Sequence, residues 1–156
     1  MKPLALKIDK LIQPFRCASS CVLSPVFDVA VRLYMANIFF KSGWLKFENF
    51  LNEDWGSTLF LFEEIHPIPF LNPSFAAISG TVGELILPIL LALGLFGRLG
   101  AVGLLIMTVV IQYGVPADYG IQHDQHYFWM FLLLMIVLKG PGKLSLDHLI
   151  QKWLKK

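Results

Sequence analysis

The sequence predicts an all-α integral membrane protein, built as a bundle of four transmembrane helices with a short interfacial helix in the first outer loop. Three observations support this prediction. First, 56% of the 156 residues are hydrophobic and only 15% are charged, whereas about a quarter of an ordinary soluble domain is charged. Second, the apolar residues, with a mean hydropathy of +0.63, are gathered in four blocks of roughly membrane-spanning length. Third, cations and acids are separated between alternate loops.

Residues 1–21 form a basic lead-in, which we expect to lie along the cytoplasmic surface of the membrane. Its charged side chains are Lys2, Lys7, Asp9, Lys10 and Arg16. Pro14 has no amide hydrogen to donate, so we expect it to break any continuous helix in this segment. Cys17 and Cys21 are four residues apart, which is not the two-residue spacing of redox and zinc motifs. We interpret the two cysteines as structural residues.

The first crossing is predicted at residues 22–47, and its polar side chains share one face. The stripe follows the repeat of a single helix face through Asp28, Arg32, Met35, Phe39, Ser42 and Lys46. Asn37 and Lys41 form a shorter stripe beside it. Asp28 lies one turn before Arg32 and can form an ion pair with it. Because charged groups are costly in hydrocarbon, this face should line the bundle interior or a water-filled cavity.

The connection at residues 48–72 contains acids and no lysine or arginine. The acids are Glu48, Glu53, Asp54, Glu63 and Glu64. Trp55 and the apolar run at 59–62 predict a short amphipathic helix in the headgroup layer, ended by a proline-rich turn at 66–69. A connection of this length would serve either as a lid over a cavity or as a docking surface.

The second crossing, residues 73–96, has Glu84 as its single charged residue. Pro88 cannot donate to the Glu84 carbonyl, so this level of the bilayer holds both an acid and a free main-chain acceptor. The third crossing, residues 97–115, begins at a turn containing Arg98. Small residues on both crossings provide faces for close helix contacts or for a homo-oligomer: Ala76, Gly80, Gly83, Gly97, Gly100 and Gly103.

The fourth crossing is predicted at residues 124–139, followed by a basic cytoplasmic tail at 140–156. In the tail, Ser145 is placed to cap a short helix. Ten of the 13 lysines and arginines fall in the lead-in, in the turn at Arg98, at Lys139 just before the tail, or in the tail itself, whose last residue is Lys156. The opposite loops carry only acids. The positive-inside rule therefore predicts that both termini are cytoplasmic. The membrane accounts for the basic residues, and no nucleic-acid partner is expected.

A polar pocket inside the bundle is the principal candidate site. We expect it to be formed by Arg32, Lys41 and Lys46 from the first crossing and Glu84 from the second. The excess of positive charge would suit a quinone carbonyl, an anionic lipid headgroup or a substrate anion. The alternative is a buried structural ion pair that fixes the register of the helices.

A second polar cluster is expected at the outer mouth, from Gln112, His123 and His126. Two histidines do not complete a metal site, and His66 is the other histidine on that side. We therefore predict interfacial hydrogen bonding there and no metal. The sequence also contains no P-loop, nucleotide fingerprint or nucleophile–base pair that we can identify. Any redox chemistry would need a partner that holds the cofactor.

Three stretches together resemble the DoxX family of bacterial four-helix inner-membrane proteins. They are RLYMANIFFKSGWLK at 32–46, GEL at 83–85 with the turn LGLFGRLG at 93–100, and GPGKLSLD at 140–147. The resemblance covers about residues 29–147 and keeps the order and spacing of the blocks, whereas the acidic loop departs from the family pattern. The resemblance implies a bacterial inner-membrane location and a link to oxidoreductase, respiratory or oxidative-stress systems, with quinone involved in some members of the family.

Three functions follow as hypotheses. The favoured one is a non-catalytic subunit that docks a redox partner and binds quinone, with no covalently bound cofactor. The alternatives are a small-molecule carrier or permease, and a structural scaffold or assembly factor. An accessory subunit is favoured over an enzyme acting alone.

Overall fold

The computed structural model describes residues 2–68, 71–120 and 122–155, and this part of the chain is helical, without a β-strand. Four helices form its body: α2 (Ser24–Leu51), α4 (Pro73–Leu93), α5 (Gly97–Val109) and α6 (Asp124–Lys139). The other elements are α1 (Lys2–Ala18), η1 (Ser19–Leu23), α3 (Trp55–Phe60), η2 (Leu61–Ile65), η3 (Val110–Gly114), η4 (Ala117–Tyr119) and α7 (Leu146–Leu154). Pro69 of the predicted turn and Lys156 of the basic tail lie outside the described residues.

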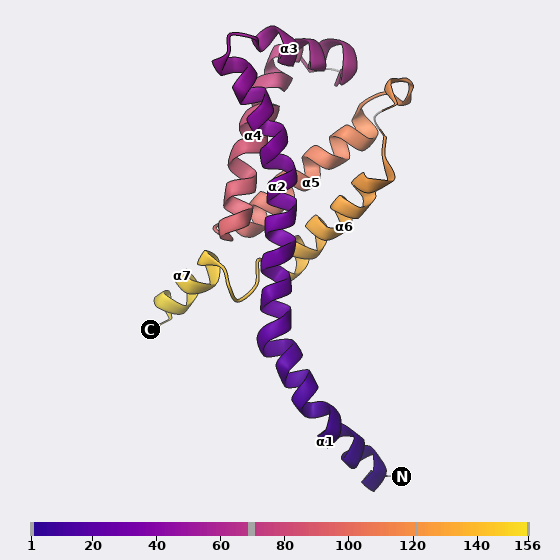
Figure 1. The fold of residues 1–156 in the computed structure, drawn as a ribbon, viewed down its shortest axis with the longest axis vertical. Coiled ribbons are helices and arrows are strands. Elements are labelled where there is room, and N and C mark those ends of the chain that lie inside the picture. Colours follow the sequence, from indigo (N-terminus) through magenta and orange to yellow (C-terminus); the bar gives the residue numbers. More distant parts are fainter. Residues whose placement is uncertain (1, 69–70, 121, 156) are drawn as a thin grey trace.

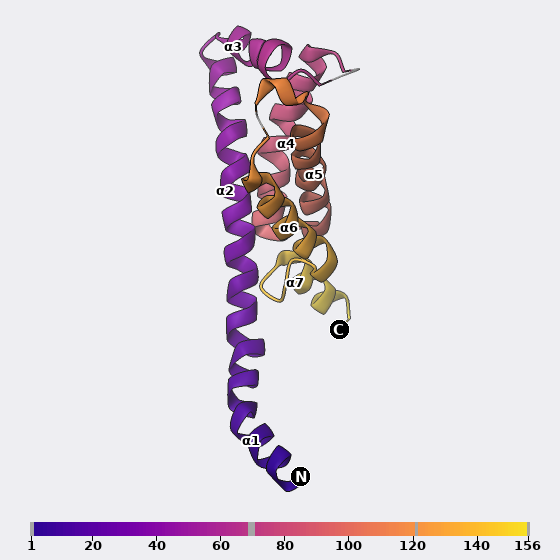
Figure 2. The same ribbon diagram turned by 90° about the vertical axis from the view of Figure 1, so that its right-hand side faces the viewer.

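The four body helices run alternately up and down and pack as neighbours in the order of the chain, with α6 also contacting α2 (Figures 1 and 2). One end of the bundle holds α3, η2 and the loop before α6, and we call it the loop end. The other end holds the α4–α5 turn and α7, and α1 extends beyond it. We call this the terminal end. Both chain termini lie toward the terminal end.

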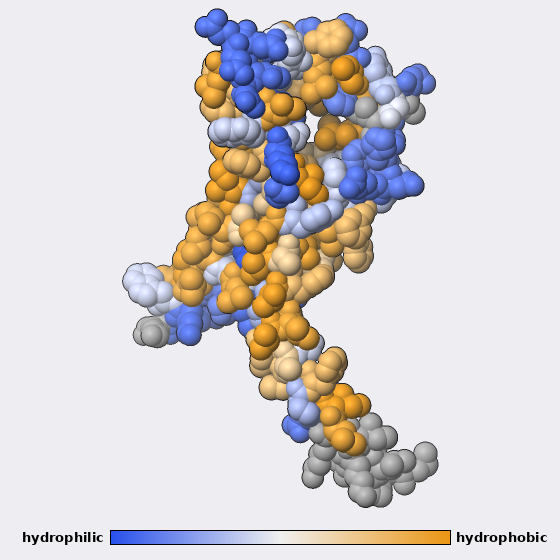
Figure 3. Space-filling view, viewed as in Figure 1, coloured by the Kyte–Doolittle hydropathy of each residue, from blue (hydrophilic) through white to orange (hydrophobic). Residues whose placement is uncertain are grey.

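The core receives side chains from all four body helices. Its members are Val31, Met35, Phe39, Leu91, Ala101, Leu104, Leu132, Leu133 and Ile136. The stripe predicted on the first crossing faces inward, because Asp28, Arg32 and Lys46 are buried together with the apolar members of the same face. Outside the core, large apolar side chains cover the middle of the molecule, while hydrophilic ones gather at the loop end (Figure 3).

Among the described residues, three helical segments are long and apolar enough to cross a membrane: Leu11–Leu51, Pro73–Leu93 and Gly97–Gly114. The predicted fourth crossing forms α6, which has 16 residues and a length of about 24 Å. This is shorter than the roughly 30 Å hydrocarbon layer. The fourth crossing therefore stays a prediction. The cytoplasmic location of both termini also stays a prediction. A short helix, α3, does form in the first long connection as expected.

The expected helix break at Pro14 is wrong. Pro14 lies inside α1, and the chain stays helical through the π-helical turn η1 into α2. A proline inside a helix removes one backbone hydrogen bond at a cost of about 3 kcal/mol, but the helix can continue past it with a kink. The π-helical turn just after it is a common place for a helix to change direction. The lead-in therefore extends beyond the bundle as a bent continuation of α2 (Figures 1 and 2).

Close packing of α4 against α5 depends on the glycines predicted to form a small face. A Cβ atom on Gly100 would lie 3.1 Å from the Leu87 carbonyl oxygen, and one on Gly103 would lie 2.6 Å from Leu87 Cδ1. The face is thus used between helices of this chain. At the tail, Ser145 caps α7 as predicted, since its Oγ accepts a hydrogen bond from the His148 amide at 3.2 Å.

Candidate functional site

An ion pair between α2 and α4 forms the polar centre of the loop half of the bundle. Lys46 Nζ lies 2.6 Å from Glu84 Oε2 and donates to Ser42 Oγ at 2.8 Å. The side chains of Lys46 and Glu84 are 10% and 8% exposed. The two helices come this close because of Gly43, where an added Cβ would lie 2.8 Å from the Glu84 carbonyl carbon. Lys46 lies one helical turn beyond Ser42, so both polar groups face Glu84.

A cavity of about 640 Å³ lies beside this ion pair, and we call it the loop-end pocket. Besides Lys46 and Glu84, its wall is mostly apolar, with contributions from η2, α4, α5 and η3 that include Leu61, Phe62, Leu87, Ile106, Met107 and Val110. Its volume is in the range of pockets that hold small molecules. An apolar wall with a few polar groups is also typical of such pockets.

The α3–η2 segment covers the loop-end pocket. Asn49 Nδ2 donates to Thr58 Oγ1 at 3.2 Å, which ties α3 to α2. On the other side, Phe62 lies against Gly80 of α4, where an added Cβ would be 3.1 Å from the phenyl ring. His66 also lines the pocket. Its pKa is lowered by burial and, secondarily, by the positive charge of Lys46. The long connection therefore lies as a lid over the pocket, one of the two roles expected for it.

Two of the four residues expected in the polar pocket lie elsewhere. Lys41 is exposed, and neither Lys41 nor Arg32 lines the loop-end pocket. Arg32 packs against Gly94, which is ten residues beyond Glu84 on α4, or about 15 Å along the helix. The expected meeting of Arg32 with Glu84 is wrong because α2 continues to Leu51. The extra turn places Lys46, rather than Arg32, level with Glu84.

Arg32 instead organises the terminal end. Its Nη2 donates to the Leu144 carbonyl, and the residue is only 2% exposed. A Cβ on Gly94 would collide with Arg32 Nη1 and would lie 2.6 Å from Ser145 Cβ, so the three residues pack tightly. Within the described chain, Arg32 Nε and Nη1 have no hydrogen-bond partner. The expected pair of Arg32 with Asp28 does not form, because Asp28 binds Lys139 of α6.

Asp147 joins the start of α7 to the α4–α5 turn. Its carboxylate accepts hydrogen bonds from the Phe96 amide at 2.8 Å and the Gly97 amide at 2.9 Å. The Asp147 amide in turn donates to the Gly94 carbonyl at 2.9 Å. A carboxylate at this position satisfies free amides at the N-terminus of α5 and favours its helix dipole. Phe96 has a positive φ of 48°, so Asp147 also holds a backbone conformation that is unfavourable for a non-glycine residue.

The three residues predicted at the outer mouth come together at the loop end. His126 Nδ1 and Gln112 Oε1 are 2.7 Å apart and share a hydrogen bond. The ring of His123 lies 5.9 Å from that of His126. His126 also packs on Trp129, with ring centroids 5.2 Å apart. In the part of the chain that the structure describes, no three His, Cys, Asp or Glu residues are grouped closely enough to hold a metal ion.

With this geometry in place, comparison with known proteins decides the family. The sequence profile of the DoxX family matches residues 27–117. The chain belongs to the DoxX family. A curated relative, an uncharacterized protein of Haemophilus influenzae, is 33% identical over 152 residues, covering 89% of this chain and 97% of the relative. No solved structure matches the chain.

In this DoxX membrane protein the matched region includes both members of the Lys46–Glu84 pair and also Arg32, but it ends before Asp147. Yet the structure brings the 32–46, 93–100 and 140–147 stretches together at the terminal end, through Arg32, Gly94 and Asp147. Neither Asp147 nor Lys139 was predicted as a polar contact. The sequence offered a signal for Asp147 alone, which lies two residues after the capping residue Ser145.

Proposed function

We propose that this DoxX protein binds a lipophilic small molecule of the quinone class in the loop-end pocket. The observation that carries the proposal is a mostly apolar cavity with one buried cation–acid pair, Lys46 and Glu84, in its wall. Such a wall suits a ligand with a flat apolar body and a hydrogen-bond-accepting head. The Lys46 ammonium would donate to a quinone carbonyl, and Glu84 would keep that ammonium oriented and charged.

The proposal places four crossings in a bacterial inner membrane, with both termini cytoplasmic. Three segments meet the requirements for a span, and α6 packs against α5 and α2 as a fourth body helix. Local thinning of the bilayer would accommodate its shorter length. The separation of cations from acids supports the orientation, because the terminal end carries Arg98, Lys139 and Lys143, while the long loop at the other end carries only acids.

A redox subunit is the proposed protein partner, and the DoxX protein itself would be an accessory membrane subunit. The sequence supports an accessory role because it contains no recognisable nucleotide-binding motif, so the partner would hold the redox cofactor. The lid formed by α3 and η2 offers the partner an exposed acidic surface next to the pocket, with Glu63 and Glu64 on it. Electrons would then be exchanged with a quinone held close to the partner.

A structural scaffold is the rival function, and one observation favours it. Lys46 has acceptors within reach for each of its three N–H groups: Glu84 Oε2, Ser42 Oγ and, at 3.5 Å, the Ser42 carbonyl. A pair satisfied in this way could serve only to fix α2 against α4. The two functions differ in what happens when both charges are removed together, since a purely structural pair can be replaced by packed apolar side chains.

The test is quinone binding by the purified full-length protein. We expect quinone to be retained from bacterial membranes, and a short-chain ubiquinone to bind after delipidation. Lys46→Met should weaken binding by about tenfold or more, the usual weight of a charged hydrogen bond. Lys41→Met makes the same change five residues away on the exposed side of α2 and should leave binding unchanged.

The double variant Lys46→Met/Glu84→Leu guards against simple misfolding, because it buries no unpaired charge. It should fold and still lose quinone. If wild-type protein binds no quinone, or if the double variant binds it as wild type does, the proposal is wrong and the scaffold function is favoured.

A further inference from the structure

A second cavity, of about 660 Å³, lies at the terminal end, and we call it the terminal-end pocket. It is formed by the start of α2, the N-terminus of α5, the loop at 139–145 and the first turn of α7. Its charged side chains are Arg98, Lys139 and Lys143, together with the acids Asp28 and Asp147, and His148 also lines it. None of these residues belongs to the loop-end pocket.

Both acids of the terminal-end pocket already have partners within the protein. Asp28 pairs with Lys139, and both carboxylate oxygens of Asp147 accept main-chain amides of the α4–α5 turn. Arg98 and Lys143 form no ion pair with any residue that the structure describes. The pocket therefore keeps an excess of positive charge. A further cation lies behind its wall, since Arg32 packs against Gly94 and Ser145, and Ser145 lines the pocket.

Exposed apolar side chains lie at the edge of the terminal-end pocket. Phe96, Leu99 and Leu138 are 61%, 64% and 71% exposed, at the adjoining ends of α4, α5 and α6. These ends mark the level at which the two spans Pro73–Leu93 and Gly97–Gly114 begin or finish. A pocket at this level would lie at the boundary between headgroups and acyl chains.

Helix α7 has the pattern of a helix that lies in the same boundary. Its apolar residues follow one face at helical spacing: Leu146, Leu149, Ile150, Trp153 and Leu154. All of them are exposed, and Lys152 and Lys155 lie on the opposite face. The helix projects sideways from the bundle (Figure 1), anchored at its start by Asp147. An amphipathic helix with lysines on its polar face binds anionic membrane surfaces.

We propose that the terminal-end pocket binds the headgroup phosphate of an anionic phospholipid, and that α7 lies in the interface of the same leaflet. Arginine and lysine side chains are the usual partners of phosphate oxygens, with arginine able to bind two at once. The exposed Phe96, Leu99 and Leu138 provide a surface for the acyl chains. This apolar surface favours a lipid over a free phosphate ion. The inference does not depend on quinone binding at the loop end.

The experiment measures binding of fluorescent short-chain phosphatidylglycerol and phosphatidylcholine to the full-length protein in micelles of a neutral detergent. We expect the protein to prefer phosphatidylglycerol, and we expect salt to weaken the preference by screening the charges. Arg98→Gln/Lys143→Gln should weaken phosphatidylglycerol binding by about fivefold for each charge removed, the ordinary weight of one cation near an anionic surface.

Two controls separate charge from folding. Arg98→Lys/Lys143→Arg keeps both charges and should keep most of the preference. Lys41→Gln removes one exposed cation outside the pocket and should change nothing. Equal binding of the two lipids by wild-type protein would overturn the proposal, as would an unchanged preference in Arg98→Gln/Lys143→Gln. Displacement of the lipid by millimolar inorganic phosphate would also overturn it, by showing a site for a soluble anion.

Discussion

The loop-end and terminal-end pockets are nearly equal in volume, about 640 and 660 Å³, but they are built in different ways. The loop-end pocket has an apolar wall, and its one ion pair joins two side chains, Lys46 and Glu84. The terminal end also has a side-chain pair, Asp28 with Lys139, but two of its charged side chains bind the main chain. Arg32 binds a carbonyl of the tail, and Asp147 binds two amides of the α4–α5 turn.

Because of this difference, the two regions should tolerate different substitutions. A side-chain pair can be removed as a unit and replaced by apolar packing. A side chain that satisfies main-chain groups cannot be replaced in this way, because the amides or carbonyls remain after the substitution. We therefore expect paired apolar substitution to be tolerated at Lys46 and Glu84, whereas no paired substitution should replace Arg32 or Asp147, whose partners are main-chain groups.

The largest effect is expected when one member of the loop-end pair is removed. Glu84→Leu leaves the Lys46 ammonium buried without its acid, which typically costs about 3–5 kcal/mol. Lys46→Met/Glu84→Leu should return the free energy of unfolding to within about 1 kcal/mol of wild type. Unfolding of the purified protein from detergent micelles measures both variants. Equal losses in the single and double variants would show that the pair is not a replaceable unit.

The next largest loss of stability is expected when Gly94, at the terminal end, is substituted. Gly94→Ala places a Cβ at a positive φ of 63°, against Arg32 and Ser145, and we expect a loss of about 3 kcal/mol from the strained backbone and the clash together. Gly120 has nearly the same backbone, with a φ of 66°, but nothing lies within 4 Å of its added Cβ. Gly120→Ala should therefore cost only about 1 kcal/mol. Equal losses in thermal unfolding would mean that the packing around Arg32 contributes little.

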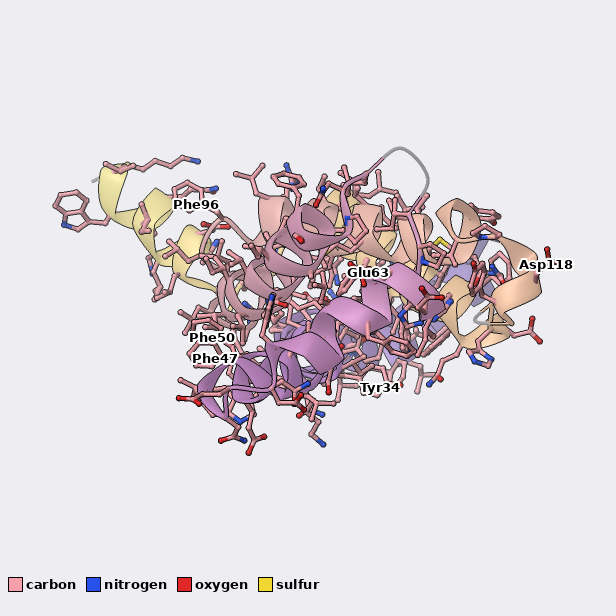
Figure 4. The ribbon with its side chains drawn as sticks, turned by 90° about the horizontal axis from the view of Figure 1, so that it is seen from above. Tyr34, Phe47, Phe50, Glu63, Phe96 and Asp118 are labelled. Atoms are coloured by element: carbon pink, nitrogen blue, oxygen red, sulfur yellow. The ribbon has the colours of Figure 1, made fainter. Side chains whose placement is uncertain are left out.

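Asp147→Asn tests the bonds from the tail to the turn. Asparagine keeps one acceptor oxygen but loses the charge and the second acceptor, so we expect a loss of about 1 kcal/mol, the usual weight of a helix cap. Hydrogen exchange should show the effect at the Phe96 and Gly97 amides. Asp118→Asn is the matched control, since Asp118 lies across the bundle from Phe96 and α7 (Figure 4). Unchanged exchange at both amides would show that Asp147 does not stabilise the α4–α5 turn.

The sequence predicted the helices and the buried stripe well, because both depend on local periodicity. Asp28, Arg32 and Lys46 share one face of α2 at any helix length, and all three are buried. What periodicity does not provide is the level at which each side chain meets its partner. The end of α2 at Leu51, four residues beyond the expected end, was enough to separate Arg32 from Glu84, while Lys46, also predicted in the pocket, lies beside it.

The terminal-end contacts were beyond prediction for a different reason. Arg32 and Leu144 are 112 residues apart in the chain, and Asp147 and Phe96 are 51 apart. Contacts of this kind depend on how the tail folds back across the end of the bundle, which no local pattern encodes. The resemblance to the DoxX family marked all of these stretches without showing that they meet.

The smallest effect is expected at the lid, where His66 lines the loop-end pocket. Burial, with help from Lys46, lowers the pKa of His66 in the closed lid below its ordinary value of about 6.5. When the lid opens, His66 takes up a proton more readily, so the closed form is fully favoured above pH 6.5 and loses stability as the pH falls below it. Hydrogen exchange of residues 55–65, corrected for the intrinsic pH dependence, should rise at most severalfold between pH 7.5 and 5.5. His66→Asn should abolish this rise, while His148→Asn at the terminal end should retain it. A rise that persists in His66→Asn would assign the pH response to another group.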